Sequence, residues 1–322
     1  MLAAYAARVS SDDPLSALEI GDQPEPVAPV GWTTVSVRAA SLNYHDLWSL
    51  RGVGLTAEQT PMILGCDAAG VDEDGNEVIV HAVIGDPDAG RGDETLDPKR
   101  SLLSERHQGA MAEKVVVPRR NMIPKPAALS FEEAACLPTA WLTAYKMLFS
   151  RSRLLPGDTV LIQGAGGGVA TAAIVLARSA GYRVWATSRS EEKRSRALEI
   201  GAHEVFESGA RLPERVDSVM ETVGEATFGH SLRSVRPGGT IVVCGATTGL
   251  TVAVELPRVF FQQIDILGST MGSRTELEGV TGFLCATGAR PVIDSVIPLS
   301  DARDGFARML AGDVFGKIVF AV

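Results

Sequence analysis

LIQGAGGGVA, residues 161–170, joins a run of branched apolar residues to a glycine-rich turn and then to an apolar segment with helical spacing. Because glycine lacks a Cβ atom, such a turn can adopt positive φ angles and lets a ligand lie against the backbone. The N–H groups and the dipole at the start of the following helix favour a negative charge. The stretch therefore predicts a turn that holds the pyrophosphate of a dinucleotide, at Ala165, Gly166, Gly167, Gly168 and Val169. The alternative is a tight turn without a ligand, and the flanking segments decide between the two.

Strands and helices alternate around this turn. Strands are expected over residues 159–163, 183–187, 204–206, 218–221, 240–244 and 265–269. Helices are expected between them, notably over residues 168–180 and 191–201. Such alternation is typical of an α/β domain with a doubly wound parallel sheet, the Rossmann arrangement, and it supplies the context that the glycine motif requires.

The end of the second strand of this unit indicates which dinucleotide binds. An NAD-binding unit carries an Asp or Glu there, which accepts a hydrogen bond from the ribose 2′-OH. This chain has no carboxylate at that place and has Ser188 and Arg189, with Lys193 in the next helix. A hydroxyl and two cations suit the extra 2′-phosphate, so the sequence predicts NADPH over NADH. Alternatively, Ser190 only caps the helix and Arg189 is solvated, and the cap and the phosphate site are compatible with each other.

A second turn of small residues follows the expected strand at residues 240–244. Cys244, Gly245 and Ala246 begin this turn, at the sheet edge where the nicotinamide is expected to lie. A plain loop is the alternative interpretation.

The two ends of the chain differ from this central part. Residues 1 to about 124 contain short β-rich runs, beginning with a first strand at residues 1–7, and are broken by Gly, Pro and Asp clusters. Residues 85–109 are polar and form either a mobile loop or a lobe at the site entrance. Helical spacing over residues 131–149 is interrupted at Pro138. In the tail we expect a helix at residues 276–287, a strand at 292–297, a helix at 302–310 and a strand at 317–321, which either extend the sheet or return to the first domain.

Composition excludes several classes of function. The 322 residues carry a formal net charge of −9, which opposes binding to nucleic acid. No apolar stretch is long enough for a membrane span, and residues 1–7 lack the basic region of a signal peptide. The four cysteines are far apart and form no C-x-x-C pair, which fits a reduced, cytoplasmic compartment.

Six motifs in this order carry a resemblance to a known family. The chain resembles the medium-chain dehydrogenase/reductase superfamily, specifically its zinc-less quinone oxidoreductase and enoyl reductase-like branch, over essentially its whole length. The motifs are SLNYHD at residues 41–46, ILGCDAAG at 63–70, LTAY at 142–145, the glycine-rich turn, ILGSTMG at 266–272 and GKIV at 316–319.

The resemblance implies a domain organisation and an assembly. It implies a β-rich GroES-like substrate domain formed by residues 1–125 and 269–322, with a Rossmann NADP-binding domain at residues 126–268 and the active site in the cleft. The tail would then return to the first domain. The family's habit also suggests a homodimer formed through edge strands of the Rossmann sheets.

Zinc alcohol dehydrogenases of this superfamily hold a catalytic metal with Cys, His and Cys or an acidic alternative. The matching positions here are Asn43, Cys66 and Thr139, and one soft ligand does not make a tetrahedral zinc site. The cysteines of the structural-zinc lobe are also missing, and His81 and His107 are isolated histidines, which are usually surface or satisfied core groups. We therefore expect no metal.

Without a Lewis acid, simple alcohol oxidation is disfavoured, whereas hydride addition to a quinone or an α,β-unsaturated carbonyl leaves a charge that hydrogen-bond donors stabilise. Tyr44 and His45 are the candidates for the catalytic donor, although Tyr44 could simply pack and Asn43 and Asp46 could serve the local backbone. Two alternatives stay open, an NADPH-binding protein of low turnover and a zinc-type alcohol dehydrogenase. By the resemblance, the residues facing the cofactor are Asn43, Thr143, Gly168, Val169, Thr222, Gly245, Ala246, Met271 and Lys317, although a terminal lysine such as Lys317 is usually solvated.

Overall fold

The computed structural model describes all 322 residues and divides them into two compact units. Unit 1 comprises Met1–Ala140, Met271–Ala286 and Ile293–Val322. Unit 2 comprises Trp141–Thr270 and Thr287–Val292. None of the helices has both the length and the apolar composition of a membrane span.

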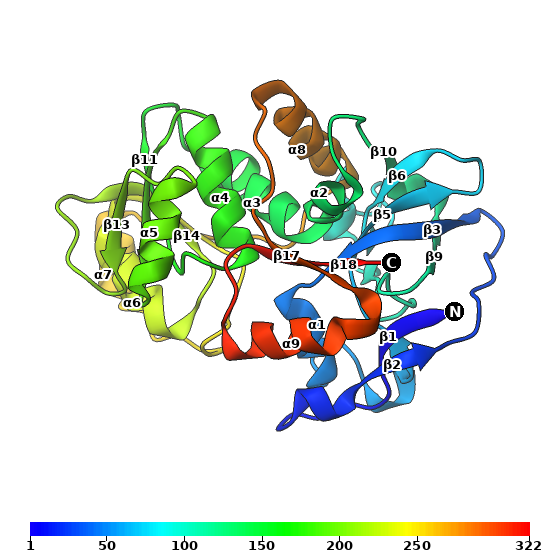
Figure 1. Cartoon of the computed structure of the whole chain (residues 1–322). Helices are drawn as coiled ribbons and strands as arrows, with labels where there is room; N and C mark the ends of the chain where they lie inside the picture. Colours follow the sequence, from blue (N-terminus) through cyan, green and yellow to red (C-terminus); the bar gives the residue numbers. More distant parts are fainter. The chain divides into compact units, whose positions relative to one another are not determined.

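Unit 2 is built on one parallel sheet, with helices such as α4 and α5 beside it (Figure 1). The strand order of this sheet is β13-β12-β11-β14-β15-β16. Its strands are β11 (Thr159–Ile162), β12 (Arg183–Ser188), β13 (Glu204–Glu207), β14 (Val216–Glu221), β15 (Val235–Val243) and β16 (Asp265–Gly268). The connecting helices are α4 (Gly168–Ser179), α5 (Glu191–Glu199), α6 (Glu225–Ser234) and α7 (Leu256–Gln262). The strand order reverses direction between β11 and β14, which is where ligands of doubly wound sheets bind. The predicted Rossmann arrangement is confirmed.

Burial explains why the central part of the sequence is so apolar. All four residues of β11 are buried, as expected for a central strand covered by helices on both faces. The small side chains of α4, including Ala170, Ala172 and Ala173, are buried in this core. Trp185 of β12 is fully buried and packs edge-on against Phe206 of β13 at 5.3 Å between ring centroids.

The structure extends one strand beyond its expected start. Strand β15 begins at Val235, whereas the sequence predicts a strand only from residue 240. Pro237, Gly238 and Gly239 are residue types that usually interrupt a strand, yet β15 continues through them. Its pairing register with the neighbouring β14 shifts between Val216 and Ser218. A bulge therefore absorbs the Pro-Gly-Gly segment within the strand.

Unit 1 contains a seven-stranded sheet with the order β10-β6-β5-β3-β18-β17, in which β9 also pairs with β3, and a second sheet with the order β2-β1-β4. The strands of the larger sheet are β3 (Trp32–Ser41), β5 (Asp67–Asp72), β6 (Glu77–Val80), β9 (Lys114–Pro118), β10 (Met122–Pro124), β17 (Ile293–Pro298) and β18 (Lys317–Ala321). The smaller sheet holds β1 (Leu2–Ala6), β2 (Leu18–Asp22) and β4 (Met62–Ile63). The main helices of the unit are α1 (Tyr44–Leu50), α2 (Phe131–Ala135), α8 (Arg274–Thr287) and α9 (Ala302–Ala311).

The C-terminal tail completes the larger sheet of unit 1. Strand β18 pairs antiparallel with β3, and β17 pairs parallel with β18 (Figure 1). Of the two possibilities for the tail, the return to the N-terminal part is therefore the one that the structure has.

Residues 85–109 form an organised lobe. Strands β7 (Val83–Ile84) and β8 (Ser101–Leu102) pair antiparallel and flank a short 3-10 helix, η3 (Glu94–Leu96). Glu94 is only 3% exposed, so this charged segment carries buried polar contacts of its own. The lobe interpretation is therefore favoured over the loop.

Candidate active site

The glycine-rich turn has the backbone that a phosphate site needs. Gly164 and Gly166 have φ angles of +76° and +125°, which side-chain-bearing residues rarely adopt. Gly167 is the N-cap of α4 and no side chain caps the helix, so its first N–H groups remain available to an anion. The turn is tied to the neighbouring strand because Ala165 N donates to Thr187 O at 2.7 Å.

Two turns at the carboxyl edge of the sheet, those after β14 and β15, are held next to the glycine-rich turn. Thr222 Oγ1, after β14, donates to Gln163 O at 3.0 Å. Gly245, after β15, comes so close that a Cβ atom there would lie 2.4 Å from Thr222 O. Gln163 itself is fully buried and accepts a hydrogen bond from Thr187 Oγ1 at 2.6 Å. The structure therefore brings Thr222 and Gly245 to the turn, and Gln163 is a residue that the sequence analysis missed.

The segment after β12 places the Lys193 side chain at this turn. A Cβ atom added to Gly166 would lie 2.7 Å from Lys193 Cδ, so the Lys193 side chain crosses over the turn. Arg189 is exposed, and Ser188 is buried. Ser190 caps α5, since its Oγ accepts from Lys193 N at 3.3 Å, so the predicted cap is present. Arg194, which the sequence analysis missed, donates to Ser188 O at 2.8 Å and supports the backbone of this segment.

The predicted residues Thr143, Cys244 and Ala246 also belong to unit 2. Thr143 is buried in α3 (Leu142–Tyr145), which packs against α4. Burial raises the pKa of the Cys244 thiol to about 12, so this cysteine is protonated at neutral pH. Ala246 lies next to Gly224, where a Cβ atom would come within 3.0 Å of its Cα.

In unit 1, a buried polar cluster surrounds Lys317. Its Nζ donates to Leu42 O at 2.7 Å, to Asn43 Oδ1 at 2.5 Å and to Asp67 Oδ2 at 3.2 Å. Asp67 Oδ2 also accepts from Asn43 Nδ2 at 2.8 Å and from Ser41 Oγ at 2.6 Å. Lys317 is 2% exposed, so the alternative that this lysine is solvated is wrong. Neither Asp67 nor Ser41 was singled out from the sequence for this cluster.

A second cluster of unit 1 centres on His45. Its Nε2 lies 2.9 Å from Glu105 Oε1, and its Nδ1 lies 3.5 Å from Cys66 Sγ. Burial by itself would lower the pKa of His45, but the Cys66 sulfur and the Glu105 and Asp46 carboxylates outweigh it and raise this pKa well above its usual range. Burial raises the pKa of the Cys66 thiol, and its Sγ donates to Leu103 O at 3.3 Å. The His45 ring therefore lies between a sulfur at Nδ1 and a carboxylate at Nε2, surroundings that favour its protonated form.

Tyr44 and Asp46 play different parts around this histidine. The Tyr44 hydroxyl lies 3.5 Å from Arg51 Nη1, and its ring packs edge-on against Trp48. Asp46 is fully buried and accepts from Asn43 N at 2.8 Å and Gly65 N at 3.0 Å, so it serves the backbone as the alternative interpretation expected. Burial, the largest effect on this carboxyl, raises the pKa of Asp46 to about 6.

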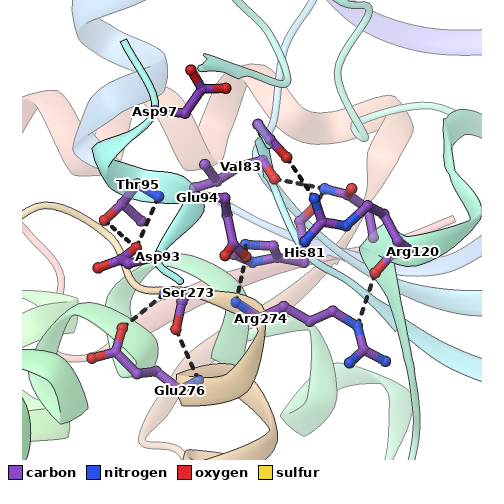
Figure 2. A network of polar contacts seen from close by, with 12 residues as sticks. His81, Val83, Asp93, Glu94, Thr95, Asp97, Arg120, Ser273, Arg274 and Glu276 are labelled. Carbon is purple, nitrogen blue, oxygen red and sulfur yellow. Dashed lines mark hydrogen bonds and ion pairs between the residues drawn. The ribbon is translucent and has the colours of Figure 1, made fainter. Parts of the chain in front are cut away.

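The lobe is fastened to the start of α8 by a buried acid (Figure 2). Glu94 Oε1 lies 3.1 Å from His81 Nε2 and accepts from Arg274 N at 2.6 Å. Burial alone would raise the pKa of Glu94, but these two contacts lower it to about 2. This segment follows Met271, which packs against the unit 1 core and has a φ angle of +46°. His81 is thus a core group, and His107 contacts Ser101 Oγ at 3.1 Å and packs against Trp32.

Comparisons with known proteins place the chain in a family. Residues 29–127 match the model of the alcohol dehydrogenase GroES-like domain, and residues 168–286 match that of the zinc-binding dehydrogenases. A solved structure of an NAD-dependent alcohol dehydrogenase is 33% identical, and the alignment covers 100% of both chains with a TM-score of 0.92. The chain belongs to the medium-chain dehydrogenase/reductase superfamily.

Two further similar proteins are named as carboxylase/reductases of CoA compounds. Crotonyl-CoA carboxylase/reductase of Cereibacter sphaeroides is 27% identical over 85% of this chain and 76% of its own length. The structure of a 2-octenoyl-CoA carboxylase reductase in complex with NADP and 2-octenoyl-CoA is 26% identical, with a TM-score of 0.91, and covers 99% of this chain and 87% of that one.

The superfamily includes zinc enzymes, and the residues at the ligand positions decide whether this chain suits zinc. Of the three matching positions, only Cys66 offers a soft ligand. The Asn43 oxygen is already bonded to the Lys317 ammonium, which is itself a positive charge. Across the chain, no group of three or more His, Cys, Asp or Glu side chains is arranged to hold a metal ion. These donors do not fit a catalytic zinc.

Proposed function

We propose that this superfamily member is an NADPH-dependent reductase of α,β-unsaturated carbonyl compounds and quinones that works without zinc. The observation that carries this proposal is the His45 cluster, which places an imidazole between the Glu105 carboxylate and Cys66, a residue at a position that matches a zinc ligand of the alcohol dehydrogenases. The ammonium of Lys317 at Asn43 supports the same conclusion, because it fills the neighbouring ligand position with a fixed positive charge.

The choice of NADPH rests on the segment after β12. Arg189 and Lys193 supply two cations there, and Lys193 crosses the glycine-rich turn. No Asp or Glu ends β12 to receive the ribose hydroxyl of NADH. A relative is described with NADP, while another is described as NAD-dependent, so the local residues carry this part of the proposal.

The bound cofactor supplies a hydride, and the protein must manage the charge and the proton that complete the reduction. Hydride addition to the β-carbon of an unsaturated carbonyl leaves an enolate on the substrate. His45, as an imidazolium, donates a proton to this enolate, and the neutral imidazole is reprotonated from solvent. Glu105 keeps the histidine charged and fixes its orientation through the 2.9 Å contact.

We also propose that the protein is a homodimer of the cytoplasm. Strand β16 is an edge strand of the unit 2 sheet, and its Ile266 is 39% exposed. The preceding helix α7 exposes Leu256, Phe260 and Phe261, which are 67%, 58% and 76% exposed. An open strand edge beside apolar side chains favours pairing with a second copy. The four cysteines are all free, in keeping with a reducing compartment.

A substrate panel tests the function. The purified protein should consume NADPH with crotonyl-CoA, a small enone or a benzoquinone, and chelator treatment should leave these rates unchanged. Alcohols with NADP⁺ should give no comparable turnover, with or without added Zn²⁺. Tight NADPH binding with no turnover on any acceptor would point to a binding protein. Zinc-dependent alcohol oxidation would point to the alcohol dehydrogenase alternative.

A further inference from the structure

A cavity of unit 2 has a lining that the proposed reductase function does not use. It has a volume of about 520 Å³ and is lined by the loop between β13 and β14, the end of α6 and one residue of α7. Its charged lining residues are Arg211, Glu214, Arg215, Arg233 and Arg258. Four guanidinium groups around one cavity stand out in a chain whose formal net charge is −9.

The positive charge of this arginine pocket is not neutralised by its own lining. The one carboxylate of the lining, that of Glu214, is paired with Arg183 at 2.6 Å, and Arg258 is paired at 3.4 Å with Glu255, which is not a lining residue. Arg215 contacts only neutral acceptors, Val235 O at 3.5 Å and Gln262 Oε1 at 3.3 Å. No carboxylate is within ion-pair distance of Arg211 or Arg233, and both side chains are exposed.

Two further polar side chains line the pocket, His230 and Ser234, whose Oγ lies 3.2 Å from His230 Nε2. His230 is 5% exposed, its Nε2 donates to Ala210 O at 2.8 Å, and its Nδ1 accepts from Gln163 Nε2 at 2.9 Å. Burial lowers the pKa of His230, so the ring is neutral. The back of the pocket is therefore a rigid, uncharged surface, and the charge comes from the arginines around it.

The pocket is separate from the glycine-rich turn. Arg215 directly precedes β14 and Arg233 lies two residues before β15, so both are at the amino ends of parallel strands. The glycine-rich turn follows the carboxyl end of β11, which is parallel to β14. A ligand held by Arg215 and Arg233 does not take the place of the dinucleotide pyrophosphate.

We propose that this arginine pocket binds a small molecule that carries two or more phosphoryl groups. Guanidinium groups offer paired N–H donors that match phosphate oxygens, and several converging arginines suit a polyanion better than a single phosphate. The volume accommodates a ligand of nucleotide size, with Leu212 and Pro213 as an apolar wall for an uncharged part.

Two calorimetric titrations with inorganic pyrophosphate test the site, one of the protein alone and one of protein saturated with NADPH, in which the dinucleotide site is filled. We expect one site per chain with NADPH bound. The double variant Arg211→Gln/Arg233→Gln should weaken binding at least tenfold. A matched control, Arg119→Gln/Arg153→Gln, removes two exposed positive charges elsewhere and should change the affinity less than twofold. Orthophosphate should bind more weakly than pyrophosphate.

Three results would overturn the proposal: no saturable binding to the wild-type protein, equal loss in the two double variants, or complete loss of pyrophosphate binding when NADPH is added. The second would mean general attraction to positive charge, and the third would mean that pyrophosphate occupies the cofactor turn. Thermal unfolding checks that the variants are folded, and Arg215→Gln provides an independent second variant if the pair is unstable.

Discussion

The buried Lys317 cluster makes a sharp prediction about stability. Lys317→Met keeps the aliphatic stem but removes an ammonium that donates to three oxygens. Asp67, which is 0% exposed, then loses the cation that it contacts. Breaking one side of a buried ion pair costs about 3–5 kcal/mol. Since Ser41 and Asn43 still donate to Asp67, we expect the lower end, about 3 kcal/mol.

This loss is large enough to measure by thermal unfolding. For a unit of this size each kcal/mol moves Tm by about 2–4 °C, so the transition of Lys317→Met should fall by about 6–12 °C. The double variant Lys317→Met/Asp67→Asn removes both charges and should recover most of the loss. Lys114→Met is the matched control, because Lys114 pairs with Glu25 at exposed positions and should cost at most about 1 kcal/mol. A drop below about 2 °C for Lys317→Met, or no recovery in the double variant, would refute the account of a buried, coupled pair.

Three further predictions concern activity and cofactor binding. Because His45 donates in its charged form and its pKa is raised, kcat should be lost as pH rises through that pKa. The substitution His45→Gln should lower kcat by about 10²–10⁴-fold. In a pH–rate profile, Glu105→Gln should move the loss of activity to lower pH. An unchanged profile in Glu105→Gln would contradict the role of His45. Arg189→Ala should raise the KM for NADPH by about 10–100-fold, the worth of a charge-assisted hydrogen bond, and leave that for NADH nearly unchanged; equal effects would remove the 2′-phosphate assignment. Gly166→Ala, at a φ of +125° and against Lys193, should weaken NADPH binding in fluorescence titrations, whereas Gly157→Ala, at +97° with open space around it, should leave the affinity unchanged.

The parts of the structure that local sequence determines were predictable. Residues 161–170 carry both the strand-to-helix turn and its glycines, and the alternation around them places most unit 2 strands within two residues of their observed ends. Apolar periodicity and turn residues act over a few positions, so one sequence suffices to find them. The bulge in β15 was missed because Pro237, Gly238 and Gly239 are equally compatible with a loop.

The polar clusters of unit 1 were only half predictable. Asn43, His45 and Lys317 were singled out, but Glu105 lies 60 positions after His45 and Asp67 lies 250 positions before Lys317. Contacts over such separations depend on how β3, β5 and β18 pair, and no local pattern reports that pairing. Lys317 is buried, although a lysine near a chain end is usually solvated, and its local sequence gives no sign of this burial.

The most direct test of the account is a calorimetric titration of the wild-type protein with NADPH and, separately, with NADH. The glycine-rich turn and the cations at Arg189 and Lys193 predict saturable binding of both, with NADPH bound at least about tenfold more tightly. Equal affinities, or no binding of either dinucleotide, would contradict the central claim.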